Sequence, residues 1–135
     1  MCGKVSEVGA FVFDCIGVGC HDCCLETRMP LSIADIRRLR ALGYSLADFM
    51  VVSGGERRLR NVDGHCFFLG VDGCRVYDVR PLGCRLYPLV VDGGGRVMVD
   101  AGCRHRGEFG LDSGSVRRLR VFVKRLRRER FREVV

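Results

Sequence analysis

Four cysteines lie within residues 15–24, in the sequence CIGVGCHDCC, together with a histidine and an aspartate. The whole chain has nine cysteines in 135 residues. Such a density is typical of two kinds of small domain, those held together by disulfides after export and those held together by metal ions in a reducing compartment. The fold of this chain must therefore bring sulfur atoms together, and the compartment decides how they are used.

The N-terminal sequence MCGKVSEVGAFVFDC has one lysine and no apolar run long enough for a secretory signal. No stretch of about 18 apolar residues occurs that could cross a membrane. We therefore expect a cytoplasmic protein without a membrane partner. In a reducing cytosol, clustered thiols are more often metal ligands than disulfides, so we expect zinc or iron, including a 4Fe-4S cluster. A disulfide framework or a reactive dithiol is the alternative.

The number of cysteines fits two four-ligand metal centres. The spacing C-x2-C at residues 20 and 23 lets one turn of backbone point two sulfurs at one ion. Adjacent side chains diverge, so Cys23 and Cys24 would serve different centres, or one would bind while the other packs. We predict as ligands Cys15, Cys20, Cys23, Cys24, Cys66, Cys74, Cys84 and Cys103. His21, His65 and His105 are less favoured candidates, and Cys2 is expected to be a free thiol.

Hydrophobic periodicity and turn residues predict a small, irregular α+β fold organised by metal in a single domain. Helices are expected near 32–43, 45–52 and 114–132, the first with Ser32 as its N-cap. A β-hairpin is expected near 89–100, and it would bring Cys84 and Cys103 nearer one another. Two Asp-Gly turns, at 63–64 and 72–73, would flank a strand over 66–69, and no repeat period is visible. We divide the chain into an N-terminal segment, 1–12, a cysteine-cluster domain, 13–112, and a C-terminal helix packed on it, 113–135.

The formal net charge of +7 belongs to the C-terminal segment. Residues 116–135 contain nine Lys or Arg and two Glu, whereas the rest of the chain is balanced at 14 basic and 14 acidic residues. Such a helix could neutralise nucleic-acid phosphates. An arginine-rich amphipathic helix is more often a solvated face over a core, so nucleic-acid binding is not favoured.

Three arginines lie close in sequence to Cys74 and Cys84, at positions 75, 80 and 85. A zinc tetrathiolate carries a net charge of about −2, which neighbouring guanidinium groups would offset while hydrogen-bonding around the sulfurs. The alternative is that Arg75, Arg80 and Arg85 are ordinary surface residues of an arginine-rich chain.

The ordered motifs resemble the cysteine-cluster family named for its CxxCxxCC motif, the zinc- or iron-chelating domain of YkgJ-type proteins. The shared features run from FDC…GCHDCC through the helix start MPLSIADI to CFFL and CRVYDVRPLGCRLYP. They cover about residues 13–103. The first gap is C-x4-C here, where the family usually has C-x2-C, so Cys15 is the ligand with altered spacing.

The resemblance implies a metal-binding module that is structural or accessory to a protein partner, and not an enzyme on its own. A related cysteine domain occurs in flagellin lysine N-methylase, which makes protein lysine N-methylation the first alternative. No Gly-rich loop between a strand and a helix is present for S-adenosylmethionine, since DGGGR is expected in a hairpin turn. Binding of S-adenosylmethionine by the purified protein would separate the two functions.

Overall fold

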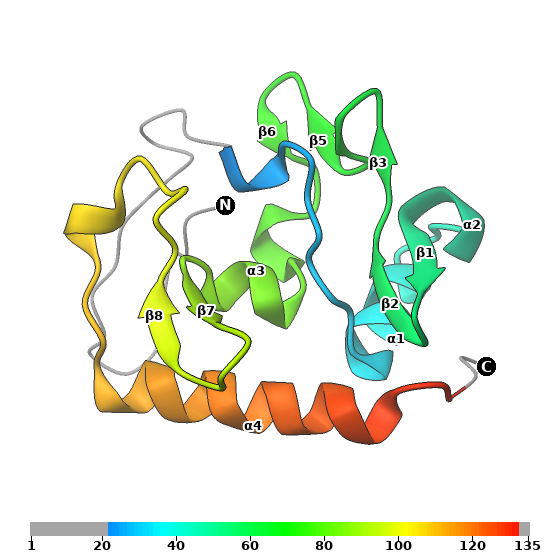
Figure 1. The fold of residues 1–135 in the computed structure, drawn as a ribbon. Coiled ribbons are helices and arrows are strands. Elements are labelled where there is room, and N and C mark those ends of the chain that lie inside the picture. The colour runs from blue at the N-terminus through cyan, green and yellow to red at the C-terminus, as the bar shows by residue number, and fades with distance from the viewer. Residues whose placement is uncertain (1–21, 133–135) are drawn as a thin grey trace.

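A computed structural model describes residues 22–132 of the chain. Four α-helices, three short 3-10 helices and four two-stranded antiparallel hairpins make up this part of the protein (Figure 1). The helices are α1 (Ile33–Ala41), α2 (Leu46–Phe49), α3 (Leu82–Leu86) and α4 (Ser113–Glu129), and the 3-10 helices are η1 (Asp22–Cys24), η2 (Tyr77–Val79) and η3 (Arg106–Glu108). The predicted small α+β class is confirmed.

Helix α1 begins where the sequence predicts. The Ser32 side chain accepts from the amide of Asp35, and the Asp35 carboxylate accepts from the amide of Ser32 at 3.0 Å, which completes a capping box. Helix α2 is shorter than the predicted 45–52. It ends at Phe49, and Met50 starts strand β1 (Met50–Ser53), which pairs with β2 (Glu56–Leu59). Two β-branched valines followed by Gly54 and Gly55, both at positive φ, favour a hairpin here.

The hairpin near 89–100 is confirmed, with β7 (Leu89–Val91) paired to β8 (Val97–Val99). The expected single strand over 66–69 is instead split between two hairpins. Strand β3 (Asn61–Val62) pairs with β4 (His65–Cys66), and β5 (Leu69–Gly70) pairs with β6 (Gly73–Cys74). Each hairpin closes through a glycine at positive φ, Gly64 or Gly73, and each ends on a cysteine. The two successive hairpins have the same structure, and we call them the β3–β6 repeat.

Two groups of buried apolar side chains form the core. The larger joins α1, α2, β2 and the β3–β6 hairpins, and the smaller joins α3, the β7–β8 hairpin and α4. Members of the larger are Cys24, Leu31, Ile36, Leu39, Phe49, Leu59, Cys66, Phe68, Val76, Tyr77 and Cys84. Members of the smaller are Leu86, Leu89, Val97, Leu119 and Phe122. The predicted cysteine ligands therefore lie mainly in the larger group.

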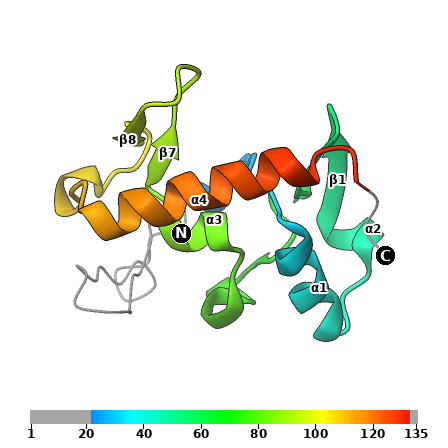
Figure 2. The same ribbon diagram turned by 90° about the horizontal axis from the view of Figure 1, so that it is seen from below.

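Helix α4 runs along one side of the molecule, from the β7–β8 hairpin to the β1–β2 hairpin (Figures 1 and 2). At its C-terminal end, the Glu129 carboxylate accepts from the amide of Ile33 at 2.8 Å. The buried guanidinium of Arg57 donates to the backbone carbonyls of Glu129 and Arg132 at 2.9 and 2.8 Å. These bonds fix the end of α4 to the start of α1 and to β2. None of the helices between residues 22 and 132 has the length and apolar character needed to cross a bilayer.

Candidate metal centre

Five cysteines line one small cavity in the larger core group. The cavity has a volume of ≈ 10 Å³, about enough for one water molecule. Its walls are formed by Cys23, Cys24, Thr27, Leu59, Cys66, Phe68, Cys74, Val76, Pro81 and Cys84. Cysteines from residue 23 to residue 84 therefore line a single cavity in the fold.

The β3–β6 repeat supplies two of these thiols at equivalent positions. Cys66 is paired with Asn61 in the first hairpin, and Cys74 is paired with Leu69 in the second. The sulfur of each cysteine hydrogen-bonds with the backbone two residues further on, at Phe68 and at Val76. A turn that presents both a sulfur and a backbone N–H to that sulfur suits a thiolate, because the N–H stabilises negative charge.

Cys24 reaches the cavity because its segment is held against the first hairpin. The amide of Glu26 donates to the carbonyl of Gly64 at 2.7 Å, and Leu25 forms an isolated bridge with His65. The side chain of Asn61 both accepts from the amide of Thr27 and donates to its carbonyl, at 3.0 and 2.9 Å. The backbone of the loop after η1 is thus hydrogen-bonded to the hairpin that carries Cys66.

Cys84 comes from α3, which is anchored by the buried carboxylate of Asp35. The same Oδ1 atom accepts from the amide of Leu82 and from the guanidinium of Arg38, at 3.0 and 2.9 Å. Arg38 also donates to the carbonyls of Val79 and Arg80. The first turn of α3, and with it Cys84, is therefore positioned by α1.

Burial raises the pKa values of three thiols in this cavity, those of Cys66, Cys74 and Cys84. The pKa of Cys66 rises from its ordinary value of 9.0 to about 12, chiefly through desolvation and further through repulsion from Cys24 and Cys74. Desolvation likewise raises the pKa of Cys74, and it raises that of Cys84 well above its ordinary value. Repulsion among the four sulfurs adds to both shifts. The thiols of Cys66, Cys74 and Cys84 therefore stay protonated at neutral pH until a cation shares the cavity.

One buried positive charge lies near the cavity. The Arg80 side chain is 5% exposed, donates to the carbonyl of Tyr77, and stacks over the Tyr77 ring at 4.1 Å. Its charge lowers the pKa of Cys74, against the larger effect of burial. Arg75 is exposed and Arg85 is half-buried. Of the three arginines noted in the sequence, Arg80 is the one whose charge is buried within reach of a cavity sulfur.

The donor set fits a soft divalent metal, because five cysteines from separate segments line one cavity and three of them are buried. Their present positions do not make a finished ligand shell. Among residues 22–132, no three His, Cys, Asp or Glu side chains are placed so that they could already hold an ion together. The sulfurs therefore have to turn inward, toward the centre of the cavity, for a metal to bind.

Other predicted ligands fall elsewhere. Cys15, Cys20 and His21, as well as the predicted free thiol Cys2, lie outside the described residues. Cys103 is fully buried but does not line the cavity, and neither do His65 and His105. The Nδ1 atom of His65 lies 3.3 Å from the carbonyl oxygen of Cys66.

Sequence reasoning missed the repeat that positions two of the thiols. The tripeptide Val-Asp-Gly occurs twice shortly before a cysteine, at residues 62–64 and 71–73, and would have revealed it. It also missed Asn61 and Asp35 as the groups that hold the Cys24 and Cys84 segments in place. A polar side chain that hydrogen-bonds to the backbone of a residue far away in the sequence produces no local sequence pattern.

The family comparison agrees with this site. No curated protein and no solved structure matches the chain significantly. The model of one protein family matches residues 14–109, which include every described cysteine, and its description is "CxxCxxCC: Putative zinc- or iron-chelating domain". That match confirms the resemblance seen in the motifs, and the chain belongs to the CxxCxxCC family.

Proposed function

We propose that this chain is a zinc- or iron-binding module whose centre is held by the thiolates of Cys24, Cys66, Cys74 and Cys84. The observation that carries the proposal is the convergence of these four side chains, three of them buried and Cys74 partly buried, on one small cavity. Cys23 lines the same cavity and, like Cys74, is partly buried, but it adjoins Cys24 in the chain, and adjacent side chains diverge. Four sulfurs suffice for a tetrahedral zinc or for an iron-sulfur cluster.

The bound metal would supply the positive charge that lets the buried thiols ionise. The chain's own groups support that ionisation. The backbone at Phe68 and Val76 hydrogen-bonds to two of the sulfurs, and Arg80 brings a buried positive charge close to Cys74. Phe68 and Pro81 are almost fully buried and keep water away from the cavity.

A structural or accessory role follows from the origin of the ligands. They come from four separate segments, namely η1, the two successive hairpins and α3. One metal centre would cross-link these segments within the larger core group, so its binding energy would contribute to folding. The number of cysteines would suit a second four-ligand centre, to which we assign the other predicted ligands, Cys15, Cys20, Cys23 and Cys103.

Metal analysis of single Cys→Ser variants tests the proposal. Protein is purified without oxygen, and its zinc, iron and acid-labile sulfide are measured together with its circular dichroism. Serine offers a hard, poorly ionised oxygen in place of a soft thiolate. We expect C24S, C66S, C74S and C84S each to lose one full centre, and C2S to keep the stoichiometry of the wild type.

Cobalt provides a second readout that does not depend on expression yield. Metal-free protein titrated with Co²⁺ should develop intense sulfur-to-metal absorption, and C84S should show a weaker and shifted spectrum. C103S reports on the second centre, since Cys103 lies outside the cavity. If C84S retained full metal content and the wild-type cobalt spectrum, the assignment of this cavity as the metal centre would be wrong.

A further inference from the structure

The outer edge of strand β1 has unpaired backbone groups. In an antiparallel pair, hydrogen-bonded and non-hydrogen-bonded positions alternate. The amide of Arg60 donates to the carbonyl of Phe49, so the register makes Val51–Arg58 and Ser53–Glu56 the bonded pairs. The backbone groups of Val52 therefore point away from β2. Between residues 22 and 132, no backbone hydrogen bond reaches them.

The opposite edge of this hairpin is already covered. The amide of Leu31 donates to the carbonyl of Arg57 at 2.8 Å, and the amide of Leu59 donates to the carbonyl of Met29 at 3.0 Å. Residues 29–31 thus act as a third strand beside β2. Within residues 22–132, the uncovered edge of the sheet is β1, where Val51 and Val52 are 42% and 65% exposed. An exposed, β-branched edge is a template on which another strand can pair.

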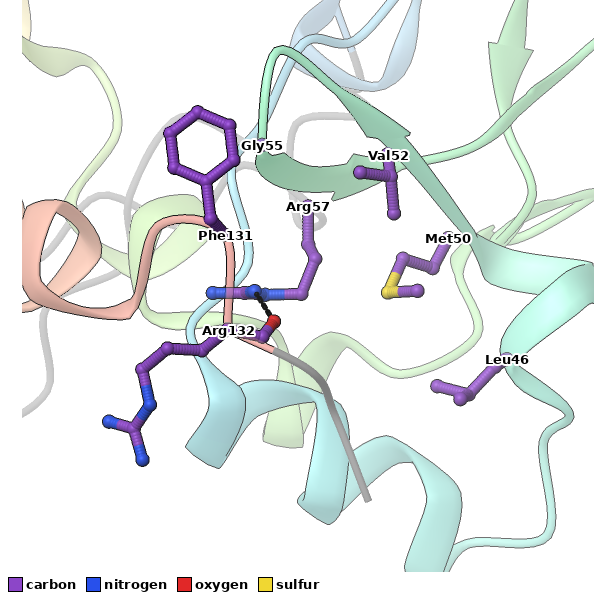
Figure 3. A pocket seen from close by; sticks show the side chains of 7 residues that line it. All are labelled: Leu46, Met50, Val52, Gly55, Arg57, Phe131 and Arg132. Atoms are coloured by element: carbon purple, nitrogen blue, oxygen red, sulfur yellow. Dashed lines mark hydrogen bonds between the residues drawn. The ribbon is translucent and has the colours of Figure 1, made fainter.

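A pocket of ≈ 540 Å³ lies beside this edge. Figure 3 shows Met50 and Val52 of β1 and Leu46 of α2 on one side of it, with Arg57 and the Phe131–Arg132 segment on the other. The Nε atom of Arg57 is buried and has no hydrogen-bond partner among the described residues. The pocket therefore combines an apolar wall with a buried cation.

The positive charge around the pocket favours an acidic binding partner over a second copy of the chain. Arg57 and Arg132 line it, and Arg130 donates to the carbonyl of Gly54 at the neighbouring turn. The carboxylate of Glu129 lies 3.9 Å from the guanidinium of Arg57 and offsets one of these charges. Two copies of the chain paired through β1 would bring like charges together, which disfavours self-association. An acidic strand would complement them.

We propose that the β1 edge is a docking site for an extended, acidic peptide segment of a protein partner. The segment adds as a strand along β1 and pairs with the N–H and C=O groups of Val52. One of its apolar side chains enters the pocket against Leu46 and Met50, and its acidic side chains face Arg57 and Arg132. This surface is separate from the cysteine cavity, so docking leaves the metal content unchanged.

A defined peptide tests the docking site. The probe is a fluorescein-labelled, end-blocked peptide of eight residues in which valine and glutamate alternate, and binding is followed by fluorescence polarisation. V52P removes the amide that pairs with the peptide but none that pairs with β2. Loss of this hydrogen bond and the added ring should weaken binding about tenfold or more. V52T keeps both the amide and the branched shape, so its affinity should stay within about twofold of the wild type.

Two further comparisons keep the test decisive if V52P misfolds, as judged by circular dichroism and metal content. The same peptide N-methylated at alternate residues should bind the wild type about tenfold more weakly, and so should a peptide with lysine in place of glutamate. R132E should also weaken binding of the glutamate peptide. Equal binding of the glutamate and lysine peptides, or of the methylated and unmethylated ones, would overturn the proposal. So would a wild-type dimer in sedimentation that V52P converts to a monomer.

Discussion

The Asp35 carboxylate and the Leu82 amide are joined by a hydrogen bond of 3.0 Å that spans 47 positions of sequence. Asp35 is almost fully buried in α1, and Leu82 opens the helix that carries Cys84. The same carboxylate caps its own helix and pairs with Arg38 at 2.9 Å. One acidic group therefore couples the start of α1 to the position of a predicted ligand.

Replacing Asp35 with asparagine should destabilise the protein by about 1–3 kcal/mol, because the amide group cannot accept all three bonds and leaves a buried donor without its partner. The free energy of unfolding in urea measures the effect. D48N, at an exposed position early in α2, is the matched control and should change stability by no more than about 0.5 kcal/mol. Equal losses in the two variants would contradict the role given to Asp35.

The metal-free protein should lose stability as the solution becomes alkaline. The pKa of Cys66 is higher in the folded state, about 12, than its ordinary value of 9.0, so its contribution is complete below about pH 9. Above that pH the unfolded chain ionises first. Stability then falls by about 1.4 kcal/mol per pH unit for each such thiol until the folded-state pKa is reached.

Thermal unfolding of metal-free, reduced protein between pH 8 and pH 11 checks this dependence. C66S removes one of the titrating thiols and should show a shallower decline with pH. A metal-free wild type whose melting temperature did not fall across this range would show that the cavity does not disfavour thiolates.

Arg80 should strengthen metal binding through its buried charge. R80Q keeps much of the side-chain volume but removes the positive charge near Cys74, so zinc affinity should fall about 10-fold to 100-fold. Competition with a chromophoric chelator measures that affinity. R75Q removes an exposed charge from the residue next to Cys74 and should alter it much less.

Nucleic-acid binding by α4 stays a prediction that salt dependence can test. The residues predicted to bind phosphates are Arg117, Arg120, Lys124, Arg125 and Arg128, all of them exposed except Arg125, which is partly buried. If they bind phosphates, affinity for DNA or RNA should fall steeply from low to physiological salt. We expect little binding at physiological salt, and tight, salt-sensitive binding under those conditions would establish this function instead.

Packing of α4 should matter more than its charge for stability. Phe122 is almost fully buried against α3 and the β7–β8 hairpin, so F122A should cost about 3–5 kcal/mol. The neighbouring Val121 is half-exposed, and V121A should change the free energy of unfolding by less than about 0.5 kcal/mol. Chemical denaturation of the two variants measures the difference.

The helices and the hairpin that the sequence predicted correctly are specified by residues close together in the chain. The capping residues of α1, the apolar spacing of α4 and the glycine turn of β7–β8 are all encoded within a few neighbouring residues. Five of the eight predicted ligands line one cavity, and their role as ligands stays a prediction. The short α2, the free edge of β1 and the bonds of Asn61 depend on contacts between distant segments, which no window of sequence contains.

The two successive hairpins influence the order in which the domain folds around a metal ion. Cys66, Cys74 and Cys84 are separated by short loops, and the entropy lost on closing a loop grows with its length. A metal ion can therefore join these three thiols early, while the chain is otherwise loosely organised. Cys24 belongs to a segment whose backbone partners lie on the first hairpin, so under the proposed function it would complete the ligand set only after that hairpin has formed. The ion would then first nucleate folding and afterwards stabilise the folded domain.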